Sequence, residues 1–192
     1  MKAIILLGTL KKEGVSNTET LTSFCNSYLG KEGIEAEVIK LVDYKILPGT
    51  YTEMNQKDDW PGIFKKLTEA DIIIFATPIW WGNHSSEIQR VIERLDEVHD
   101  KIEDGEESPL ADKPVGIIIT GDSDGSQHII GSISNFVNAI GMFVPPFSTL
   151  SVQAEEHIKD AEPGEEKLLE LYEKDYAEDA AQMAAQLKKY AE

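Results

Sequence analysis

Nearly continuous apolar runs alternate with longer amphipathic stretches along the chain. Three of these runs end in glycine, threonine or proline, as buried strands of a parallel sheet often do. Residues 35–41 alternate in polarity instead, which predicts a strand nearer to the sheet edge. Phe143 and Val144 predict the start of a short fifth strand. The three central strands are expected at residues 2–8, 70–76 and 115–120.

Between the expected strands, apolar residues recur at the spacing of one helix face. The first helix is expected at residues 17–31, with Ser16 as its N-cap and Glu19 completing a capping box. Residues 42–58 and 99–113 contain proline, glycine and many polar residues, so we expect loops there. The other helices are expected after Asp58 or Asp59, from Ile88 to Val98, from Ile129 to Ile140, and at about residues 164–191.

This alternation of strands and helices predicts an α/β fold with a doubly wound, five-stranded parallel sheet flanked by helices. We expect a single domain over residues 1–192, with an added C-terminal amphipathic helix at about 164–191. In such sheets, ligands bind beyond the carboxyl ends of the strands. The polar loops that follow residues 8, 76 and 120 should therefore meet at one edge and form the ligand site.

The composition excludes several classes of protein. The net charge of −17 and the pI of about 4.6 argue against binding to nucleic acid or to anionic membranes. The single cysteine, Cys25, excludes an internal disulfide and falls on the apolar face of the first helix, so we expect it in the core. His99 and His157 have no partner at metal-ligand spacing, and no metal is expected. The N-terminus is too short and strand-like for a signal peptide, and no apolar run reaches membrane-spanning length, which predicts a cytoplasmic protein.

The first polar loop has the chemistry of a phosphate site. Unsatisfied N–H groups and the helix dipole converge at a helix N-terminus, and hydroxyl and amide side chains surround this one. The loop lacks both the nucleotide-triphosphatase pattern G-x-x-x-x-G-K-[ST] and the dinucleotide pattern G-x-G-x-x-G. One phosphate monoester could be held by Thr9, Ser16, Asn17 and Thr18, with Lys11 nearby. The alternative is an ordinary capped helix that follows a polar loop.

The segment Glu69–Asn83, which reads EADIIIFATPIWWGN, resembles the central signature of flavodoxin-like, FMN-dependent NAD(P)H oxidoreductases, the family of NADPH-dependent FMN reductases and flavodoxins. The first loop resembles the phosphate loop of that family, with Thr9 and Lys11 in the positions of a serine and an arginine. Residues 114–127 resemble its third loop. The resemblance covers about residues 1–145 and implies a flavodoxin-like fold.

The resemblance also implies a function. The chain is expected to bind FMN and to transfer hydride from NADH or NADPH to a flavin, quinone or similar small acceptor. No catalytic side chain is needed, because hydride passes directly between the nicotinamide and the flavin. A homo-oligomer, dimer or tetramer, is also implied. The positions assigned to the cofactor are Thr9, Lys11, Ser16, Asn17, Thr18, Pro78, Ile79, Trp80, Trp81, Gly82, Asn83, Gly121, Asp122 and Gly125.

The chain departs from the family in two respects. Many relatives carry cysteines in the loop matching residues 46–58, some of which bind an iron–sulfur cluster, whereas this chain has none there. The third loop is acidic, with Asp122 and Asp124, where the family has a glycine-rich loop. Two alternative functions follow: a flavodoxin-type electron carrier that docks to basic partners through its acidic surface, and a binding module that has kept the fold without the cofactor.

Other residues near the expected site have less specific interpretations. Trp80 is a candidate to line the flavin or substrate space, whereas Trp81 is expected to pack inward. Asn83 is a candidate N-cap for the helix that follows. His84 and His128 are expected to be solvated side chains at the rim of the site.

Overall fold

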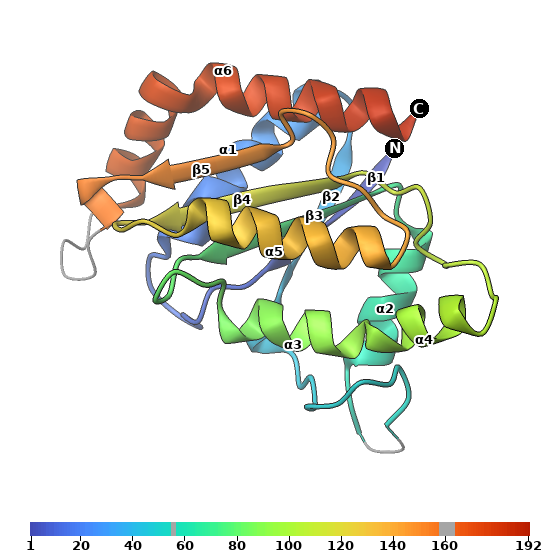
Figure 1. Cartoon of the computed structure of the whole chain (residues 1–192). Helices are drawn as coiled ribbons and strands as arrows, with labels where there is room; N and C mark the ends of the chain where they lie inside the picture. Colours follow the sequence, from blue (N-terminus) through green and yellow to red (C-terminus); the bar gives the residue numbers. More distant parts are fainter. Residues whose placement is uncertain (55–56, 158–163) are drawn as a thin grey trace.

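The computed structural model of the chain describes residues 1–54, 57–157 and 164–192. Its centre is a parallel sheet with the strand order β2-β1-β3-β4-β5 (Figure 1). This is the doubly wound, flavodoxin-like order, so the predicted fold class is confirmed. The strands are β1 (Lys2–Leu7), β2 (Glu35–Lys40), β3 (Ile72–Pro78), β4 (Val115–Gly121) and β5 (Thr149–Gln153).

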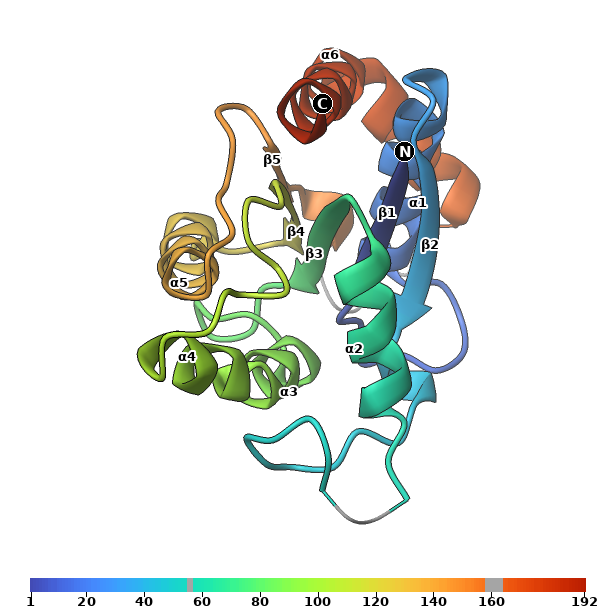
Figure 2. The same ribbon diagram turned by 90° about the vertical axis from the view of Figure 1, so that its right-hand side faces the viewer.

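Helices cover both faces of the sheet (Figures 1 and 2). On one face, α1 and α6 pack over the strands around Leu21, Phe24 and Met183. The other helices pack on the opposite face, in a core that includes Trp60 and Ile88. The helices are α1 (Asn17–Lys31), α2 (Trp60–Glu69), α3 (Ser86–Arg94), α4 (Asp96–Glu103), α5 (Ser126–Ala139) and α6 (Glu165–Ala191), with short 3₁₀ turns at Leu41–Asp43 and Glu155–His157. No described helix is long and apolar enough to cross a lipid bilayer.

The expectation of a fifth strand at Phe143 and Val144 is wrong. Phe143 forms only an isolated bridge to Pro114, and β5 begins six residues later, at Thr149. Pro145 and Pro146 follow directly and have no N–H to donate to a ladder. The next residue, Phe147, adopts a left-handed φ of 61°, which turns the chain before the strand can start.

The helix expected from Ile88 to Val98 is two helices, and the expected loop at 99–113 begins later. Leu95 ends α3 with its N–H shared between the carbonyls of Val91 and Ile92. Helix α4 then runs to Glu103, because buried Val98 anchors it to the core. The polarity of residues 99–103 favours a loop, because most of the residues on the outer face of α4 are charged.

The capping box at α1 forms only in part. The Ser16 hydroxyl accepts from the N–H of Glu19 at 3.3 Å, as expected. The carboxylate of Glu19 pairs with Lys40 Nζ at 2.9 Å, so it does not return to the cap. The C-terminal end of β2 is thereby tied to the first turn of α1.

A buried arginine organises the long loop between β2 and α2. The loop expected at 42–58 includes residues 55 and 56, which lie outside the described residues. Elsewhere in it, the guanidinium of Arg94 donates to the carbonyls of Leu47, Tyr51 and Thr52 and forms an ion pair with Asp58. Burial alone would raise the pKa of Asp58, but hydrogen bonds from Arg94 and from backbone N–H groups lower it. The same carboxylate accepts from the Trp60 N–H at 3.1 Å and so serves the start of α2.

Candidate functional site

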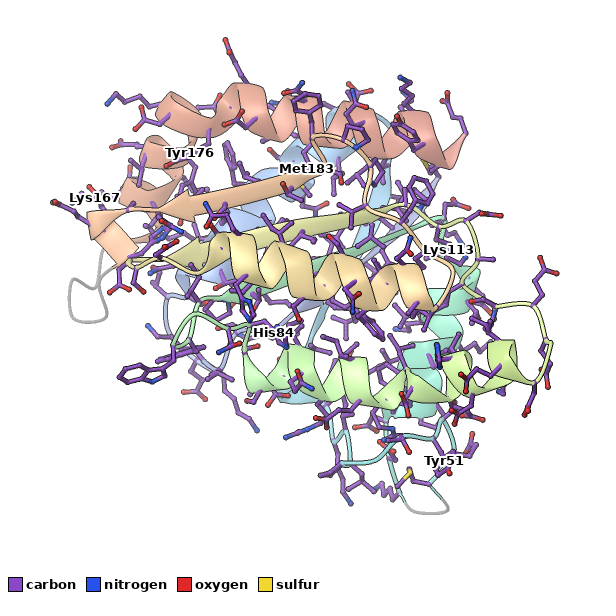
Figure 3. The ribbon with its side chains drawn as sticks, viewed as in Figure 1. Tyr51, His84, Lys113, Lys167, Tyr176 and Met183 are labelled. Atoms are coloured by element: carbon purple, nitrogen blue, oxygen red, sulfur yellow. The ribbon has the colours of Figure 1, made fainter. Side chains whose placement is uncertain are left out.

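Three loops meet at the carboxyl edge of the sheet. We call residues 8–16 the first loop and residues 79–85 the second loop; they follow β1 and β3. The third loop is residues 121–125, which begins with the last residue of β4. In Figure 3, His84 lies at this edge, whereas Lys113, which precedes β4, lies at the opposite end of the sheet. The sequence therefore correctly predicts that these loops converge.

The first loop is closed on itself by hydroxyl groups. Thr9 Oγ1 lies 2.8 Å from Ser16 Oγ and also accepts from the N–H of Lys11 at 3.3 Å. Both hydroxyl residues are buried. Gly8 is required at the entry, because a Cβ there would lie 2.5 Å from Cγ1 of Ile88 on α3. These internal contacts define the conformation of the first loop.

The N-terminus of α1 offers backbone donors to this loop. Within the described part of the chain, the N–H groups of Asn17 and Thr18 have no acceptor. Their side chains are engaged elsewhere: Thr18 Oγ1 lies 2.7 Å from Thr120 Oγ1, and Asn17 Nδ2 donates to the His157 carbonyl at 3.4 Å. These two residues therefore favour an anion through their backbone rather than through their side chains.

Two lysines near the first loop bond to its backbone carbonyls. Lys11 is exposed, and its ammonium donates to the Val15 carbonyl at 2.9 Å, across the loop. Lys40 donates to the Lys12 carbonyl at 3.1 Å and pairs with Glu19. Both ammonium groups therefore stabilise the loop, and neither is fixed over the α1 N-terminus.

The second loop is a tight turn with an exposed tip. The backbone groups of Trp80 and Asn83 exchange two hydrogen bonds, at 2.8 and 2.9 Å. Trp81 and Gly82 between them have positive φ values of 50° and 77°, the pattern of a type I′ turn. Trp80 is 42% exposed and Trp81 is 96% exposed, so the expectation that Trp81 packs inward is wrong. The turn points this side chain away from the sheet.

This turn also limits which backbone groups can face a ligand. The N–H and C=O groups of Trp80 and Asn83 bond to each other, and the Trp81 carbonyl accepts from Asn83 Nδ2 at 3.1 Å. The N–H groups of Trp81 and Gly82, at the tip of the turn, have no backbone acceptor in residues 1–54, 57–157 and 164–192. Asn83 is not the N-cap of α3, because Ser85 has that role and accepts from the N–H of Ile88 at 3.4 Å.

Two glycines let the third loop approach the second. A Cβ at Gly121 would lie 2.7 Å from Cδ1 of Ile79, and one at Gly125 would lie 2.7 Å from Cα of Gly82. Gly125 also has a φ of 142°, which side chains disfavour. The preceding strands are in register here, because Pro78 at the end of β3 pairs with Thr120. Asp122 is exposed at the start of the third loop.

Comparison with known proteins identifies the family. The sequence matches the family described as NADPH-dependent FMN reductase over residues 1–157. The chain belongs to this family. A curated relative, the 8-demethyl-8-aminoriboflavin-5′-phosphate synthase of Streptomyces davaonensis, is 32% identical over 156 residues, or 76% of this chain and 61% of that protein. An iron–sulfur flavoprotein of Archaeoglobus fulgidus is 33% identical over 103 residues, or 49% of this chain and 48% of that protein. This FMN reductase family member therefore spans less than two thirds of the length of these relatives.

Solved structures agree with the sequence match. A crystal structure of RosB with a bound intermediate, 8-demethyl-8-formylriboflavin-5′-phosphate, has a TM-score of 0.80 and 26% identity, and the match covers 100% of this chain and 79% of that one. A flavone reductase has a TM-score of 0.72 and 18% identity, covering 100% of this chain and 63% of that one. The second likeness supports the fold alone.

In this FMN reductase family member, the structure adds residues to the edge that sequence reasoning missed. Thr120 lies near the end of β4 and Ser85 is the N-cap of α3, so the end of an expected strand and the start of an expected helix are the signals that could have found them. His157 and Tyr172 carry no such signal. They meet behind the first and third loops, with 2.8 Å between Nε2 and the hydroxyl, although they lie fifteen positions apart in the sequence. The two rim histidines bond to neighbouring amides: His84 to Gln89 at 2.8 Å and His128 to Asn83 at 3.2 Å.

Two expectations about other side chains in the family member can be compared with the structure. Cys25 is buried in the core, as predicted, and burial raises the pKa of its thiol to about 12. His99 was expected to have no partner at metal-ligand spacing, but the ligand atoms of His99, Asp100 and Glu103 lie within 4.8 Å of one another. These groups lie on α4 and are largely solvent-accessible, where acidic side chains often gather without an ion.

Proposed function

We propose that the chain binds FMN across the three loops and transfers hydride from NADPH or NADH to a flavin, quinone or similar small acceptor. The observation that carries the proposal is the first loop: the buried hydroxyls of Thr9 and Ser16 lie at a helix N-terminus whose first N–H groups have no acceptor among the described residues. That arrangement fits one phosphate monoester in a protein whose net charge gives anions no general attraction. Membership of the NADPH-dependent FMN reductase family supports FMN as the molecule that carries this phosphate.

Each loop has a separate task in this proposal. Ser16 and the N–H groups of Asn17 and Thr18 hold the phosphate, with Thr9 fixing Ser16 and Lys11 adding a screened charge. The tip N–H groups of Trp81 and Gly82 face the flavin ring, and Pro78, Ile79 and Trp80 position that tip. Gly121, Asp122 and Gly125 form the opposite border, and Asn83 holds the turn. When bound, FMN supplies the hydride chemistry, and the chain contributes binding, orientation and backbone dipoles.

We further infer that the chain works as a homo-oligomer in the cytoplasm. Four large apolar side chains are exposed on the first and second loops: Leu10, Val15, Trp80 and Trp81. An exposed apolar rim of this kind is typical of a surface that another molecule covers. Light scattering after gel filtration would measure the mass in solution. A monomer at high protein concentration would contradict this part of the proposal.

The main experiment is anaerobic mixing of the FMN-loaded protein with NADPH or NADH. Rapid loss of the flavin absorbance, followed by its recovery when an acceptor such as riboflavin or a quinone is added, is the expected result. A sample without protein gives the uncatalysed rate. If FMN binds but neither nucleotide reduces it, the flavodoxin-type electron carrier is the better assignment. If FMN does not bind at all, the cofactor-free binding module is favoured.

A second candidate function is chemical modification of the flavin itself. It is motivated by the likeness to the Streptomyces davaonensis synthase, whose name describes a riboflavin-5′-phosphate derivative as the product. In that case the same site would take riboflavin 5′-phosphate as substrate. Mass spectrometry of the flavin recovered after turnover discriminates between the candidates. An unchanged mass supports the reductase, and a changed mass supports modification.

A further inference from the structure

A buried histidine–tyrosine pair lies behind the junction of the first and third loops. His157, in the turn after β5, places Nδ1 3.2 Å from the Gly121 carbonyl and Nε2 2.8 Å from the Tyr172 hydroxyl. Tyr172 comes from α6 and is completely buried. Both Gly121 and Asn17, which the pair also contacts, are residues that we assign to the cofactor site.

The hydrogen-bond roles follow from the chemistry of the groups. The Gly121 carbonyl can only accept, so Nδ1 of His157 carries the proton. Nε2 is then an acceptor, and the Tyr172 hydroxyl donates a hydrogen bond to it. The pair is therefore neutral and internally satisfied, as a buried polar group must be to avoid a desolvation penalty.

The pair also contacts the first residue of α1. The hydrogen bond that joins the pair to α1 runs from Asn17 Nδ2 to the His157 carbonyl, at 3.4 Å. The Tyr172 hydroxyl also lies 3.4 Å from the Asn17 carbonyl, but its one proton is donated to His157. The aromatic ring of Tyr172 packs against Phe24 of α1, with 5.8 Å between ring centroids. The third loop and the first turn of α1 are thus held by one set of contacts.

These hydrogen bonds are not required for the packing of α6. The helix is anchored by apolar side chains that include Leu168, Met183 and Leu187, and a phenylalanine ring could fill the space of Tyr172. Helix α6 also lies beyond residues 1–157, over which the chain matches its family. The hydroxyl of Tyr172 therefore adds to the shared fold a contact that reaches the proposed phosphate site from behind.

We infer that His157 and Tyr172 are positioning residues that hold the first turn of α1 against the third loop and so set the affinity for the ligand phosphate. Neither side chain touches the ligand in this account. Because the pair is uncharged, it fixes the position of the N–H donors without changing the local charge. For its ligand this inference rests on the proposed function.

The test is Tyr172→Phe, which removes the hydroxyl and keeps the ring. The dissociation constants of FMN and riboflavin are measured for each variant. FMN should bind about three- to tenfold more weakly, as expected for one lost hydrogen bond, while riboflavin, which has no phosphate, should be unchanged. An unchanged FMN affinity, or an equal loss for both ligands, would overturn the inference.

Two further variants make the test specific. Tyr28→Phe removes another hydroxyl between α1 and α6, since Tyr28 donates to Glu173 at 3.1 Å near the other end of α1. This matched control should leave the FMN-to-riboflavin ratio unchanged. His157→Asn keeps a donor for the Gly121 carbonyl but cannot reach Tyr172. It should reproduce the effect of Tyr172→Phe, and the double variant should be no worse than either single one.

A readout without ligand separates this inference from the proposed function. Hydrogen exchange of residues 19–24 should accelerate in Tyr172→Phe and not in Tyr28→Phe, because the first turns of α1 lose their support. If the parent protein does not bind FMN, the proposed function is wrong, and the exchange result alone decides the positioning role. If the parent binds FMN and exchange is unchanged in Tyr172→Phe, only the positioning role is wrong.

Discussion

Two buried polar anchors hold loops in this protein, and they differ in charge. Arg94 and Asp58 form an ion pair that anchors the loop between β2 and α2. His157 and Tyr172 form a neutral pair beside the third loop and the start of α1. The Arg94 guanidinium donates to three backbone carbonyls as well as to the Asp58 carboxylate. The side chains of His157 and Tyr172 instead lie against the carbonyls of Gly121 and Asn17.

The difference matches what each loop must do. The loop between β2 and α2 is long, and the several N–H donors of the singly charged Arg94 guanidinium join distant parts of it. The proposed phosphate site needs N–H donors that are fixed in position, with no additional buried charge close to the bound anion. A buried charge there would shift the anion affinity through electrostatics, which act strongly at low dielectric. A neutral pair supports such a site without this effect.

Breaking the ionic anchor should cause the largest loss of stability. Asp58→Ala leaves the Arg94 charge buried without its partner, which should cost about 3–5 kcal/mol of unfolding free energy. Urea unfolding measures this loss. Asp59→Ala is the matched control, because it removes only an exposed hydrogen bond to the Lys45 N–H. Comparable losses of unfolding free energy in the two variants would show that the buried ion pair stabilises the fold no more than the exposed hydrogen bond does.

The next largest effect is expected at the first loop. Ser16→Ala removes a hydroxyl that faces the α1 N-terminus, and a hydrogen bond to a charged group is worth about 1.5–3 kcal/mol. FMN should bind about ten- to a hundredfold more weakly, with riboflavin much less affected. Thr18→Val should have a smaller effect than Ser16→Ala, because the Thr18 hydroxyl bonds to Thr120. If the two variants lose FMN equally, the Thr18 hydroxyl must turn toward the phosphate when it binds.

The contrast between Ser16 and Thr18 shows how far the sequence could predict the site. Helix start, N-cap and loop chemistry are local properties, and the sequence predicted them within one or two residues for β1 and α1. The direction of a side chain depends on its tertiary partner. Thr120 is 102 residues from Thr18, so the pattern around residue 18 could not reveal where its hydroxyl points.

The same reasoning explains the other errors. The large apolar side chain of Trp81 is typical of a core residue, but the position of Trp81 in the turn exposes this side chain to solvent. The break at Leu95 leaves the apolar spacing from Ile88 to Val98 intact, so periodicity could not detect it. The Arg94 anchor and the His157–Tyr172 pair join distant segments, and neither has a local motif.

The neutral anchor should respond to pH. Burial lowers the pKa of His157 below its ordinary value, despite hydrogen bonds to Gly121 and Val152 and the nearby carboxylates of Glu156 and Asp122. His157 therefore binds a proton more readily in the unfolded chain than in the folded protein. The stabilisation by neutral His157 is complete above about pH 6.5 and decreases as the pH falls toward the lowered pKa.

The expected slope in that window is at most about 1.4 kcal/mol per pH unit, the value for one proton. Unfolding measured between pH 7 and 5 in the parent and in His157→Gln isolates the contribution of this residue from that of the carboxylates. The variant should show a shallower decrease in stability as the pH falls. Parallel curves would mean that His157 has the same pKa in the folded and unfolded chains.

A smaller effect is expected at the tip of the second loop. Trp81 has a left-handed φ that costs a side chain about 1 kcal/mol, and its ring gains little from burial. Trp81→Gly should therefore raise the unfolding free energy by up to about 1 kcal/mol. If the tryptophan has been retained to cover the flavin, flavin affinity should fall while stability rises. A destabilised variant would show that the tip is not strained.

The smallest effect is expected for Lys11, which separates charge from geometry at the phosphate site. Its ammonium is exposed and donates to the Val15 carbonyl, so water and salt screen it from a phosphate. Lys11→Ala should weaken FMN binding by only about twofold at low ionic strength, since screened surface charges contribute below about 1 kcal/mol. Lys12→Ala is the control, because its side chain lies one residue further along the same exposed loop. In 0.5 M salt the effect of Lys11→Ala should disappear, while that of Ser16→Ala should persist. A loss at Lys11 that equals the loss at Ser16 and survives high salt would place the ammonium on the phosphate, and the site would then depend on charge rather than on the oriented N–H groups of α1.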